Sequence, residues 1–400
     1  MTYPNYSIGE ILEKKNKGVN APKLVLLYEE VEKYRKTMER RVADCLQTMS
    51  AMKPDHKMRW IQENVPSDIQ QYVRLAVLGK EVNVLMRSEK KWKTVADIGL
   101  KVSEPESTRE HIEEWFSHWD KQAQLLSALD VQVYESHAHY NLKPFKAVRE
   151  RLLPMIHSAG VKQIIIPAVE YATNHQMVRL FDTPEYDYIR YAFGSHPKYV
   201  WKENWTSQKW DEFRTLLEHP KCVAIGETGL DYSYSELCEK HRATQLEMFA
   251  LLIEEANRHD LPLILHIRSA KEDALCEFDA KEDAMEMLST KKLHTGAVLH
   301  CFGGTASDVS KYMELGISAF GLGGKITYGI TELESAVATM PESAIVLETD
   351  APYIKVDGER SPNTSLSLLE IAGKVAQLRG TTTEHILAVS YENADRLFRK

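Results

Sequence analysis

The chain has 400 residues, of which 43% are hydrophobic and 27% charged, and its formal net charge is −8. This is the composition of an ordinary soluble globular protein with a large core. The acidity argues against a simple basic nucleic-acid coat protein, but it does not exclude a nuclease, because bound divalent cations reverse the local field at a site. Five scattered cysteines without CxxC pairing favour reduced thiols and a cytoplasmic location. We find no signal-peptide pattern and no run near the roughly 18 apolar residues of a membrane span, so no membrane association is expected.

Residues 1–127 are predicted to form an all-α N-terminal domain. Apolar residues recur every three to four positions from Pro22 to Ser50, which predicts a long amphipathic helix with one buried stripe. Further helices are predicted from Pro66 to Gly79 and from Ser107 onward, where Ser107 and Glu110 form a plausible capping box. The basic run at 90–93, with its single tryptophan, could bind a phosphate backbone, although a solvated surface is the more common explanation. The segment contains no catalytic constellation.

From residue 129 the pattern changes, and residues 128–400 are predicted to form a second domain. Short runs rich in Val and Ile alternate with amphipathic helical stretches, which is typical of a parallel sheet buried on both faces. The predicted strands are 131–136, 162–168, 188–193, 222–226, 261–266, 296–300, 316–321 and 343–348. Eight such units over this length match a (β/α)8 TIM-type barrel, with an open doubly wound sheet as the alternative.

The first of these strands ends in Glu135-Ser136-His137-Ala138-His139. Side chains two apart on a strand point to the same face, so His137 and His139 should converge on one point. Imidazole is a common ligand of divalent transition metals, and a carboxylate or two would complete such a site. A lone HxH pair is weak evidence, so the rest of the chain has to supply the missing ligands.

Further histidines and carboxylates stand at the ends of later predicted strands. Glu227 ends the fourth strand, His266 the fifth and His300 the sixth, and the eighth runs into Asp350. In a barrel these ends gather on one face, where active sites are built. Alone, His266, His300 or Asp350 would more often be a structural residue. A carboxylate directly after the apolar run 223–226, however, would be buried and would need a partner or a metal. Together the six residues predict a metal site.

The segment from about residue 129 to 400 resembles the TatD family of metal-dependent deoxyribonucleases, among the amidohydrolase-like barrels. The motifs that carry the resemblance are Ser136-His137-Ala138-His139, Gly194-Ser195-His196-Pro197, 225–232 (IGETGLDY), 261–268 (LPLILHIR), His300-Cys301-Phe302-Gly303-Gly304, 347–353 (LETDAPY) and 393–398 (NADRLF). The family usually has Asp where this chain has Glu135, and we expect that change to be tolerated. The N-terminal segment lies outside the family's single-domain plan.

The resemblance implies two divalent ions bridged by Glu227, which activate a water for in-line attack at phosphorus. It assigns His137, His139 and Asp350 to one ion and His266 and His300 to the other. Asp350 is the expected general base.

Substrate contacts are predicted at the mouth of the barrel. Arg268, two residues after a predicted ligand, could hold a phosphate bidentately, with a structural ion pair as the alternative. His196 is a candidate for binding a phosphate. Tyr328 and Tyr353 could stack a terminal base, or they could simply pack in their loops.

The expected function is that of a metal-dependent deoxyribonuclease acting as a 3′ exonuclease on single-stranded or frayed DNA. One alternative keeps the metals and changes the bond, as in an aminoacyl-tRNA deacylase, and a second is a scaffold with a vestigial site. Histidine ligands favour Zn²⁺ or Mn²⁺, although the family resemblance also allows Mg²⁺. DNA is the expected partner, and residues 1–127 could bind a protein.

Overall fold

The computed structural model describes residues 36–37, 40–50, 52, 54–66, 69–77, 109–233, 235–270, 278–359 and 361–399. The chain divides into two compact units, Met1–His111 and Ile112–Lys400. The basic run at 90–93, Ser107 and most of the helix predicted over 22–50 lie outside the described residues.

The described part of the first unit is helical. Residues 40–48 are helical, followed by α3 (Pro54–Asn64) and α4 (Gln70–Val77). A helix was predicted from Pro66 to Gly79, and α4 occupies Gln70–Val77 of that range, with the Pro66 carbonyl accepting hydrogen bonds from the amides of Ile69 and Gln70. The buried apolar side chains are Val42, Met49, Ile61, Val65, Ile69 and Val73.

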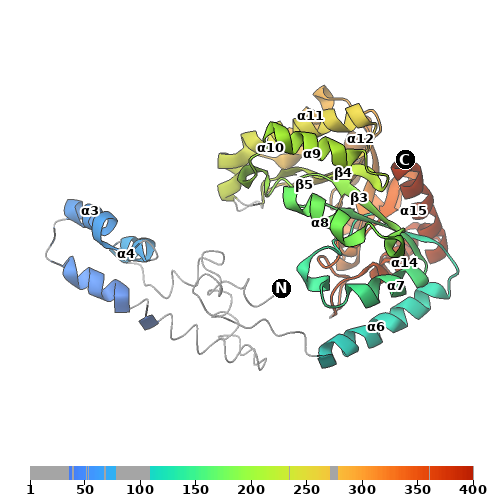
Figure 1. The fold of residues 1–400 in the computed structure, drawn as a ribbon, viewed down its shortest axis with the longest axis horizontal. Helices are drawn as coiled ribbons and strands as arrows, with labels where there is room; N and C mark the ends of the chain where they lie inside the picture. Colours follow the sequence, from blue (N-terminus) through green and yellow to red (C-terminus); the bar gives the residue numbers. More distant parts are fainter. Residues whose placement is uncertain are drawn as a thin grey trace. The chain divides into compact units, whose positions relative to one another are not determined.

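The second unit contains the predicted (β/α)8 barrel, shown in Figure 1. Its strands are β1 (Val133–Glu135), β2 (Val161–Pro167), β3 (Ile189–Phe193), β4 (Cys222–Asp231), β5 (Leu263–Arg268), β6 (Ala297–Leu299), β7 (Ile317–Leu322) and β8 (Ile345–Leu347). All neighbours pair in parallel, in chain order. The ring closes where the Ser136 amide donates to the Leu347 carbonyl at 3.2 Å and Ala138 bridges Ala351.

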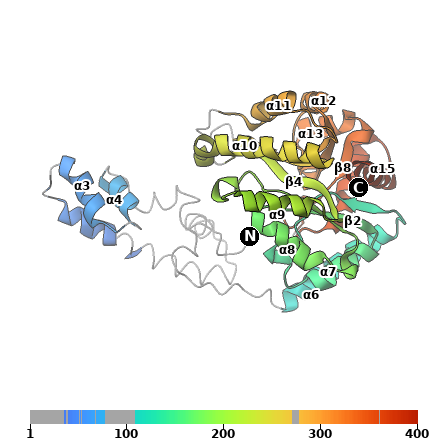
Figure 2. The same ribbon diagram turned by 45° about the horizontal axis from the view of Figure 1, so that its top comes forward.

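Helices cover the outside of the strands, as Figures 1 and 2 show. They are α7 (Arg149–Ser158), α8 (Tyr171–Phe181), α9 (Ser207–Leu217), α10 (Ser235–His259), α11 (Ala280–Thr290), α12 (Ala306–Glu314), α13 (Thr331–Thr339), α14 (Leu368–Arg379) and α15 (Thr383–Phe398). Capping residues fix several of their starts. Thr305 and Asp308 form a complete capping box at α12, for example.

The inside of the barrel is filled by a cluster to which every strand contributes. Its members include Tyr134, Ile165, Ala192, Ala224, Ile264, Val298, Ala319 and Val346. Helix α15 adds Ala394 and Phe398 to the same cluster. The rings of Phe398 and Tyr391 lie 6.2 and 5.8 Å from that of Tyr134. The barrel interior is therefore packed core, and chemistry is left to the strand ends and their loops.

Helix α6 (Arg109–Ser127) precedes the first strand and packs on the barrel. Phe116, Trp119 and Leu126 are buried in the main core cluster, and the Arg151 guanidinium lies 3.7 Å from the Phe116 ring centroid. The sequence division at residue 127 placed α6 in the N-terminal segment, whereas its residues from Ile112 belong to the compact unit of the barrel. A separate helical domain before α6 stays a prediction.

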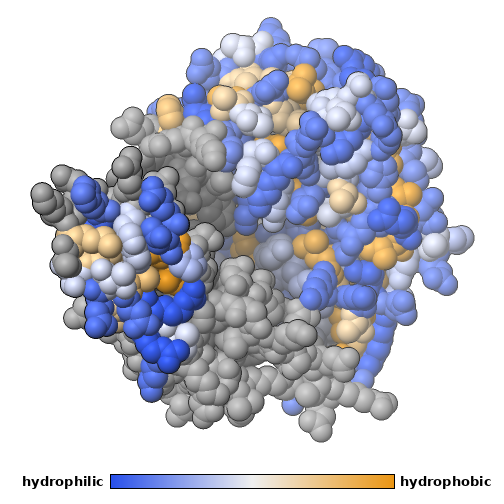
Figure 3. Space-filling view, turned by 60° about the vertical axis from the view of Figure 1, so that its left-hand side comes forward, coloured by the Kyte–Doolittle hydropathy of each residue, from blue (hydrophilic) through white to orange (hydrophobic). Residues whose placement is uncertain are grey.

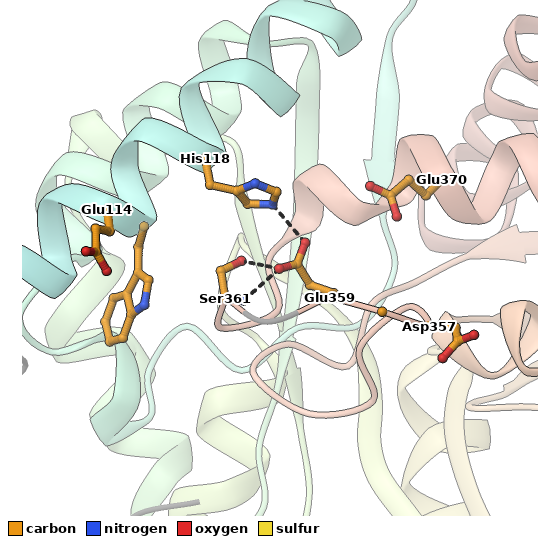
Figure 4. A pocket seen from close by; sticks show the side chains of 8 residues that line it. Glu114, His118, Asp357, Glu359, Ser361 and Glu370 are labelled. Carbon is orange, nitrogen blue, oxygen red and sulfur yellow. Dashed lines mark hydrogen bonds and ion pairs between the residues drawn. The ribbon is translucent and has the colours of Figure 1, made fainter. Parts of the chain in front are cut away.

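A pocket of about 670 Å³ lies between α6 and the loop that follows β8, and Figure 4 shows its lining. The lining residues are Glu114, Trp115, His118, Asp357, Gly358, Glu359, Ser361 and Glu370. His118 Nε2 and Glu359 Oε2 are 2.8 Å apart, which ties α6 to this loop.

Hydrophilic side chains dominate the described surface that Figure 3 shows, and hydrophobic ones form small separate groups. Within the described ranges, no helix combines the length and apolar character needed to span a bilayer.

Candidate metal centre

The six predicted ligands come from five strand ends. His137 and His139 follow β1, Glu227 and His266 lie within β4 and β5, His300 follows β6 and Asp350 follows β8. All of them except His266 and Asp350 are buried, and those two side chains are only 15% and 13% exposed. The barrel thus brings the six residues together at one rim, as the strand-end pattern predicted.

One oxygen of Glu227 faces the residues that follow β1 and β8. Its Oε2 lies 3.5 Å from His137 Nε2 and 3.8 Å from His139 Nε2. Asp350 Oδ1 lies 3.8 and 3.3 Å from the same two nitrogens, and the nitrogens themselves are 3.2 Å apart. His137, His139 and Asp350 form a group whose ligand atoms could hold a metal ion.

The other oxygen of Glu227 faces a second set of imidazoles. Its Oε1 lies 3.0 Å from His266 Nδ1, 3.5 Å from His196 Nε2 and 3.7 Å from His300 Nε2. His196, Glu227 and His266 form another group with metal-ligand spacing. The two carboxylate oxygens of Glu227 therefore lie close to two different sets of imidazole nitrogens.

Two further carboxylates bind the far nitrogens of these imidazoles. Asp231 Oδ2 lies 3.3 Å from His266 Nε2, and Glu348 Oε1 lies 2.9 Å from His300 Nδ1. A carboxylate on the far nitrogen orients a ligating imidazole and makes it more basic. The sequence prediction did not include Asp231 or Glu348 among the site residues. The available signal was their spacing, four residues after Glu227 and two before Asp350.

Glu348 is buried, and its position depends on Gly321 of β7. The Cys301 amide donates to Glu348 Oε1 at 2.7 Å, beside the contact with His300. A Cβ at Gly321 would lie 2.1 Å from Glu348 Oε2. Only a glycine leaves room for this carboxylate.

Glu135, the departure from the family pattern, is buried and joins the ends of β1 and β8. It accepts hydrogen bonds from the His137 amide at 3.2 Å, the Thr349 amide at 2.9 Å and the Thr349 hydroxyl at 2.7 Å. Burial raises the pKa of Glu135 to about 8, against the effect of these hydrogen bonds. The longer side chain thus supports the backbone that carries His137 and Asp350.

Burial and mutual charge set the protonation of the centre. Burial opposes ionisation of Glu227, but the surrounding imidazoles hold its pKa well below the ordinary value. Burial also opposes ionisation of Asp350, yet the hydrogen bond from His139 and the charge of His300 lower its pKa. Burial disfavours a charged His300 as well, but the Glu348 carboxylate raises its pKa well above the ordinary value. The carboxyl groups of Glu227 and Asp350 are therefore ionised at neutral pH.

His196 has a defined tautomer. Its Nδ1 accepts the Lys198 amide at 3.0 Å, so the proton of the neutral ring lies on Nε2, which faces Glu227. Burial and the neighbouring His266 lower the pKa of His196 to about 3. A protonated Nε2 donates a hydrogen bond and leaves no lone pair there for a metal.

The other predicted substrate residues lie on exposed parts of the chain. Arg268 ends β5, and its guanidinium makes no hydrogen bond or ion pair with residues that the structure describes. Tyr353 is 52% exposed, with its ring centroid 6.0 Å from that of His139. Tyr328 is 47% exposed, and its hydroxyl donates to the Lys355 carbonyl at 2.7 Å. The substrate roles of these residues stay predictions.

A (β/α)8 barrel whose strand ends gather imidazoles and carboxylates in this way belongs to the class of metal-dependent barrel hydrolases. A family model described as "TatD related DNase" matches residues 134–399. The chain belongs to this TatD family of metal-dependent hydrolases.

Similar proteins cover the barrel and little else of the chain. The uncharacterized metal-dependent hydrolase YabD of Bacillus subtilis is 29% identical over 269 residues, which are 67% of this chain and 99% of that protein. A protein of Pantoea vagans named 3′-5′ ssDNA/RNA exonuclease TatD is 28% identical over 263 residues, which are 64% of this chain and 95% of its own. The crystal structure of the TatD homologue YjjV of Escherichia coli K12 matches with a TM-score of 0.59 at 26% identity, over 67% of this chain and 98% of that one. The family match begins at β1, so α6 precedes it.

Proposed function

We propose that the protein is a metal-dependent phosphodiesterase, a deoxyribonuclease that removes nucleotides from the 3′ ends of single-stranded or frayed DNA. One observation carries the proposal. The buried Glu227 carboxylate lies between two sets of imidazoles and presents one oxygen to each. A carboxylate in this position could contact both ions of a two-metal site, and such sites catalyse phosphodiester cleavage.

In the proposed centre, His137, His139 and Asp350 would hold one divalent ion, His266 and His300 would hold the other, and Glu227 would be available to both. The donors fit such ions. His137 Nε2 and His139 Nε2 lie 3.2 Å apart, with oxygens of Glu227 and Asp350 nearby, so the lone pairs of both nitrogens could bind one divalent ion. His266 and His300 each have a carboxylate on the other ring nitrogen, which leaves the nitrogen nearer Glu227 free to ligate. Mixed imidazole and carboxylate ligands suit Zn²⁺ or Mn²⁺, and Mg²⁺ remains an alternative.

When bound, the ions polarise the phosphate and lower the pKa of a water to about 7. Asp350 then accepts the proton of the attacking water. Its carboxylate is ionised and partly open to solvent, with 13% of the side chain exposed.

His196 and Arg268 hold the phosphate in this proposal. The His196 Nε2–H group faces the centre beside Glu227 and can donate to a phosphate oxygen without changing its protonation state. Arg268 offers a guanidinium that other described residues do not occupy, as a bidentate phosphate contact requires. Tyr353, whose ring centroid lies 6.0 Å from that of His139, would stack the terminal base.

The choice of single-stranded DNA draws support from relatives. Some similar proteins are named 3′-5′ ssDNA/RNA exonucleases, whereas others are named only as metal-dependent hydrolases. The names therefore favour a nuclease and leave RNA as a competing substrate.

The test compares end-labelled single-stranded DNA, closed plasmid and aminoacyl-tRNA as substrates after metal analysis of the purified protein. We expect the metal-loaded protein to shorten the labelled strand from its 3′ end. Glu227→Ala and Asp350→Asn should abolish this cleavage. Asp357→Asn, an exposed aspartate in the same loop region, is the matched control and should retain it.

The other outcomes separate the alternatives. Metal-dependent loss of the acyl bond with intact DNA would replace the nuclease by a deacylase. A protein that binds no divalent metal and cleaves none of the three substrates would be a scaffold.

A further inference from the structure

A group of aromatic and basic side chains lies beside the metal centre and has no part in the proposed chemistry. The loop after β3 and the short helix η4 (Val200–Lys202) supply Lys198, Tyr199, Trp201 and Lys202, and α10 supplies His241. We call these five residues the η4 platform. Trp201 and His241 are stacked, with centroids 4.4 Å apart and planes at 12°. The Lys202 Nζ lies 4.9 Å from the Trp201 centroid and 5.9 Å from that of Tyr199, and the Lys198 Nζ lies 5.6 Å from Tyr199.

The platform is joined directly to His196, the proposed phosphate donor. The Tyr199 amide donates to the His196 carbonyl at 2.9 Å, and the Tyr199 and His196 ring centroids lie 6.0 Å apart. The Lys202 amide donates to the Tyr199 carbonyl at 2.8 Å. One continuous turn therefore carries both the phosphate donor and the platform.

Glu203 accepts three hydrogen bonds that fix the loop after β3. Its Oε2 accepts the Ser195 hydroxyl at 2.6 Å and the Trp205 indole N–H at 2.9 Å, and its Oε1 accepts the Tyr171 amide at 2.6 Å. A loop held by three such bonds presents its outer side chains in one arrangement. Binding to a surface that is already ordered costs less conformational entropy.

The outer side chains of the platform are open to solvent. Trp201 is 36% exposed, and Lys202 is exposed and makes no ion pair with a described carboxylate. An open indole beside lysines, on a chain with net charge −8, marks a local cationic and aromatic surface. Surfaces that bind single-stranded nucleic acid combine these two features, because lysines contact the backbone while flat rings stack bases of any sequence.

We propose that the η4 platform binds the single-stranded nucleic acid next to the phosphate that is cleaved, with a base on Trp201 and the backbone along Lys198 and Lys202. This inference rests on the proposed function. A base would take the place of the Lys202 ammonium over the indole, and the flexible lysine stem lets that ammonium move to a phosphate. Stacking needs an open base face, so the platform selects single strands over duplexes.

The test measures binding and catalysis separately. Binding of a fluorescein-labelled, phosphorothioate-linked oligothymidylate is followed by anisotropy in Mn²⁺. Hydrolysis of bis(p-nitrophenyl) phosphate reports the metal centre, because this small diester has neither a nucleobase nor a neighbouring phosphate for Trp201 and Lys202 to bind. The variants are Trp201→Ala and Lys202→Gln. Leu125→Ala and Lys311→Gln are matched controls at exposed positions away from the site.

We expect Trp201→Ala to weaken oligothymidylate binding about tenfold. Lys202→Gln should lower the slope of log affinity against log salt by about 0.7. Neither variant nor control should change diester hydrolysis. Because Lys202 is exposed, Lys202→Gln should fold normally, and it tests the platform even if Trp201→Ala does not fold.

Each remaining outcome decides one proposal. Oligothymidylate affinity and salt slope equal to those of the wild type in both variants would overturn the platform and leave the phosphodiesterase intact. Platform-dependent binding without any diester or DNA hydrolysis by the wild type would overturn the phosphodiesterase and leave a nucleic-acid surface. No binding by the wild type would overturn the platform outright.

Discussion

Replacing Glu348 by glutamine should weaken the binding of one metal ion and leave the affinity for the other unchanged. Glutamine has nearly the same shape, so the change removes the charge that faces His300 Nδ1 at 2.9 Å while one acceptor oxygen remains. Both side chains are buried, with 1% and 4% exposed. A hydrogen bond to a charged group contributes about 1.5–3 kcal/mol and a neutral one about 0.5–1.5 kcal/mol. The difference, about 1–1.5 kcal/mol, corresponds to roughly tenfold in affinity, within the ~10–100-fold range seen when such outer partners are lost.

The assay is a titration of the metal-free protein with Zn²⁺ against a chromogenic chelator. We expect two binding steps, with only one of them weakened about tenfold by Glu348→Gln. Glu342→Gln is the control, because Glu342 also pairs with a histidine, His385, at 3.1 Å, but on the surface. Two unchanged steps, or two equally weakened ones, would refute the assignment of Glu348 to a single ion through His300.

Three further predictions concern the stability of the fold and the metal content. Trp119→Ala should reduce the free energy of unfolding by about 3–5 kcal/mol in guanidinium, because this indole of α6 is fully buried; a loss below about 1 kcal/mol would mean that α6 contributes little. Gly321→Ala should lower metal content while the circular dichroism stays that of a folded barrel, since the new Cβ collides with Glu348; full metal content would contradict it. Burial opposes ionisation of Asp283, but Arg242 lowers its pKa, so this carboxylate stabilises the fold above the unfolded pKa and stops doing so as pH falls through the folded one. Wild type should therefore lose more stability than Asp283→Asn between neutral pH and about pH 3, and equal losses in urea titrations would contradict this.

The strand pattern predicted the barrel and the meeting of its six polar residues. This worked because parallel strands place their carboxyl ends on one face, whatever the loops do. All eight predicted strands are present, with ends shifted by a few residues. The prediction also named His196, whose Nε2 lies 3.5 Å from Glu227 Oε1, and Arg268, whose substrate role stays a prediction.

The carboxylates behind the imidazoles could not be predicted in the same way. The fourth strand was predicted to end at Gly226, where its apolar run ends. In the structure β4 continues to Asp231, since β5 pairs with it as far as Arg268. That extension brings Asp231 to His266, a contact that depends on pairing between strands. The packing of α6 was missed for a similar reason, because an amphipathic helix does not specify its partner.

Because the chain is synthesised from its N-terminus, the barrel interior around Tyr134 is completed late. Tyr134, on the first strand to be made, finds its stacking partner Phe398 in a helix that is translated after all eight strands. Until α15 emerges from the ribosome, the inner residues around Tyr134 remain open to water at that end. A nascent or truncated chain without this helix should therefore bind chaperones at the end of the barrel that α15 covers, even though every strand is already present.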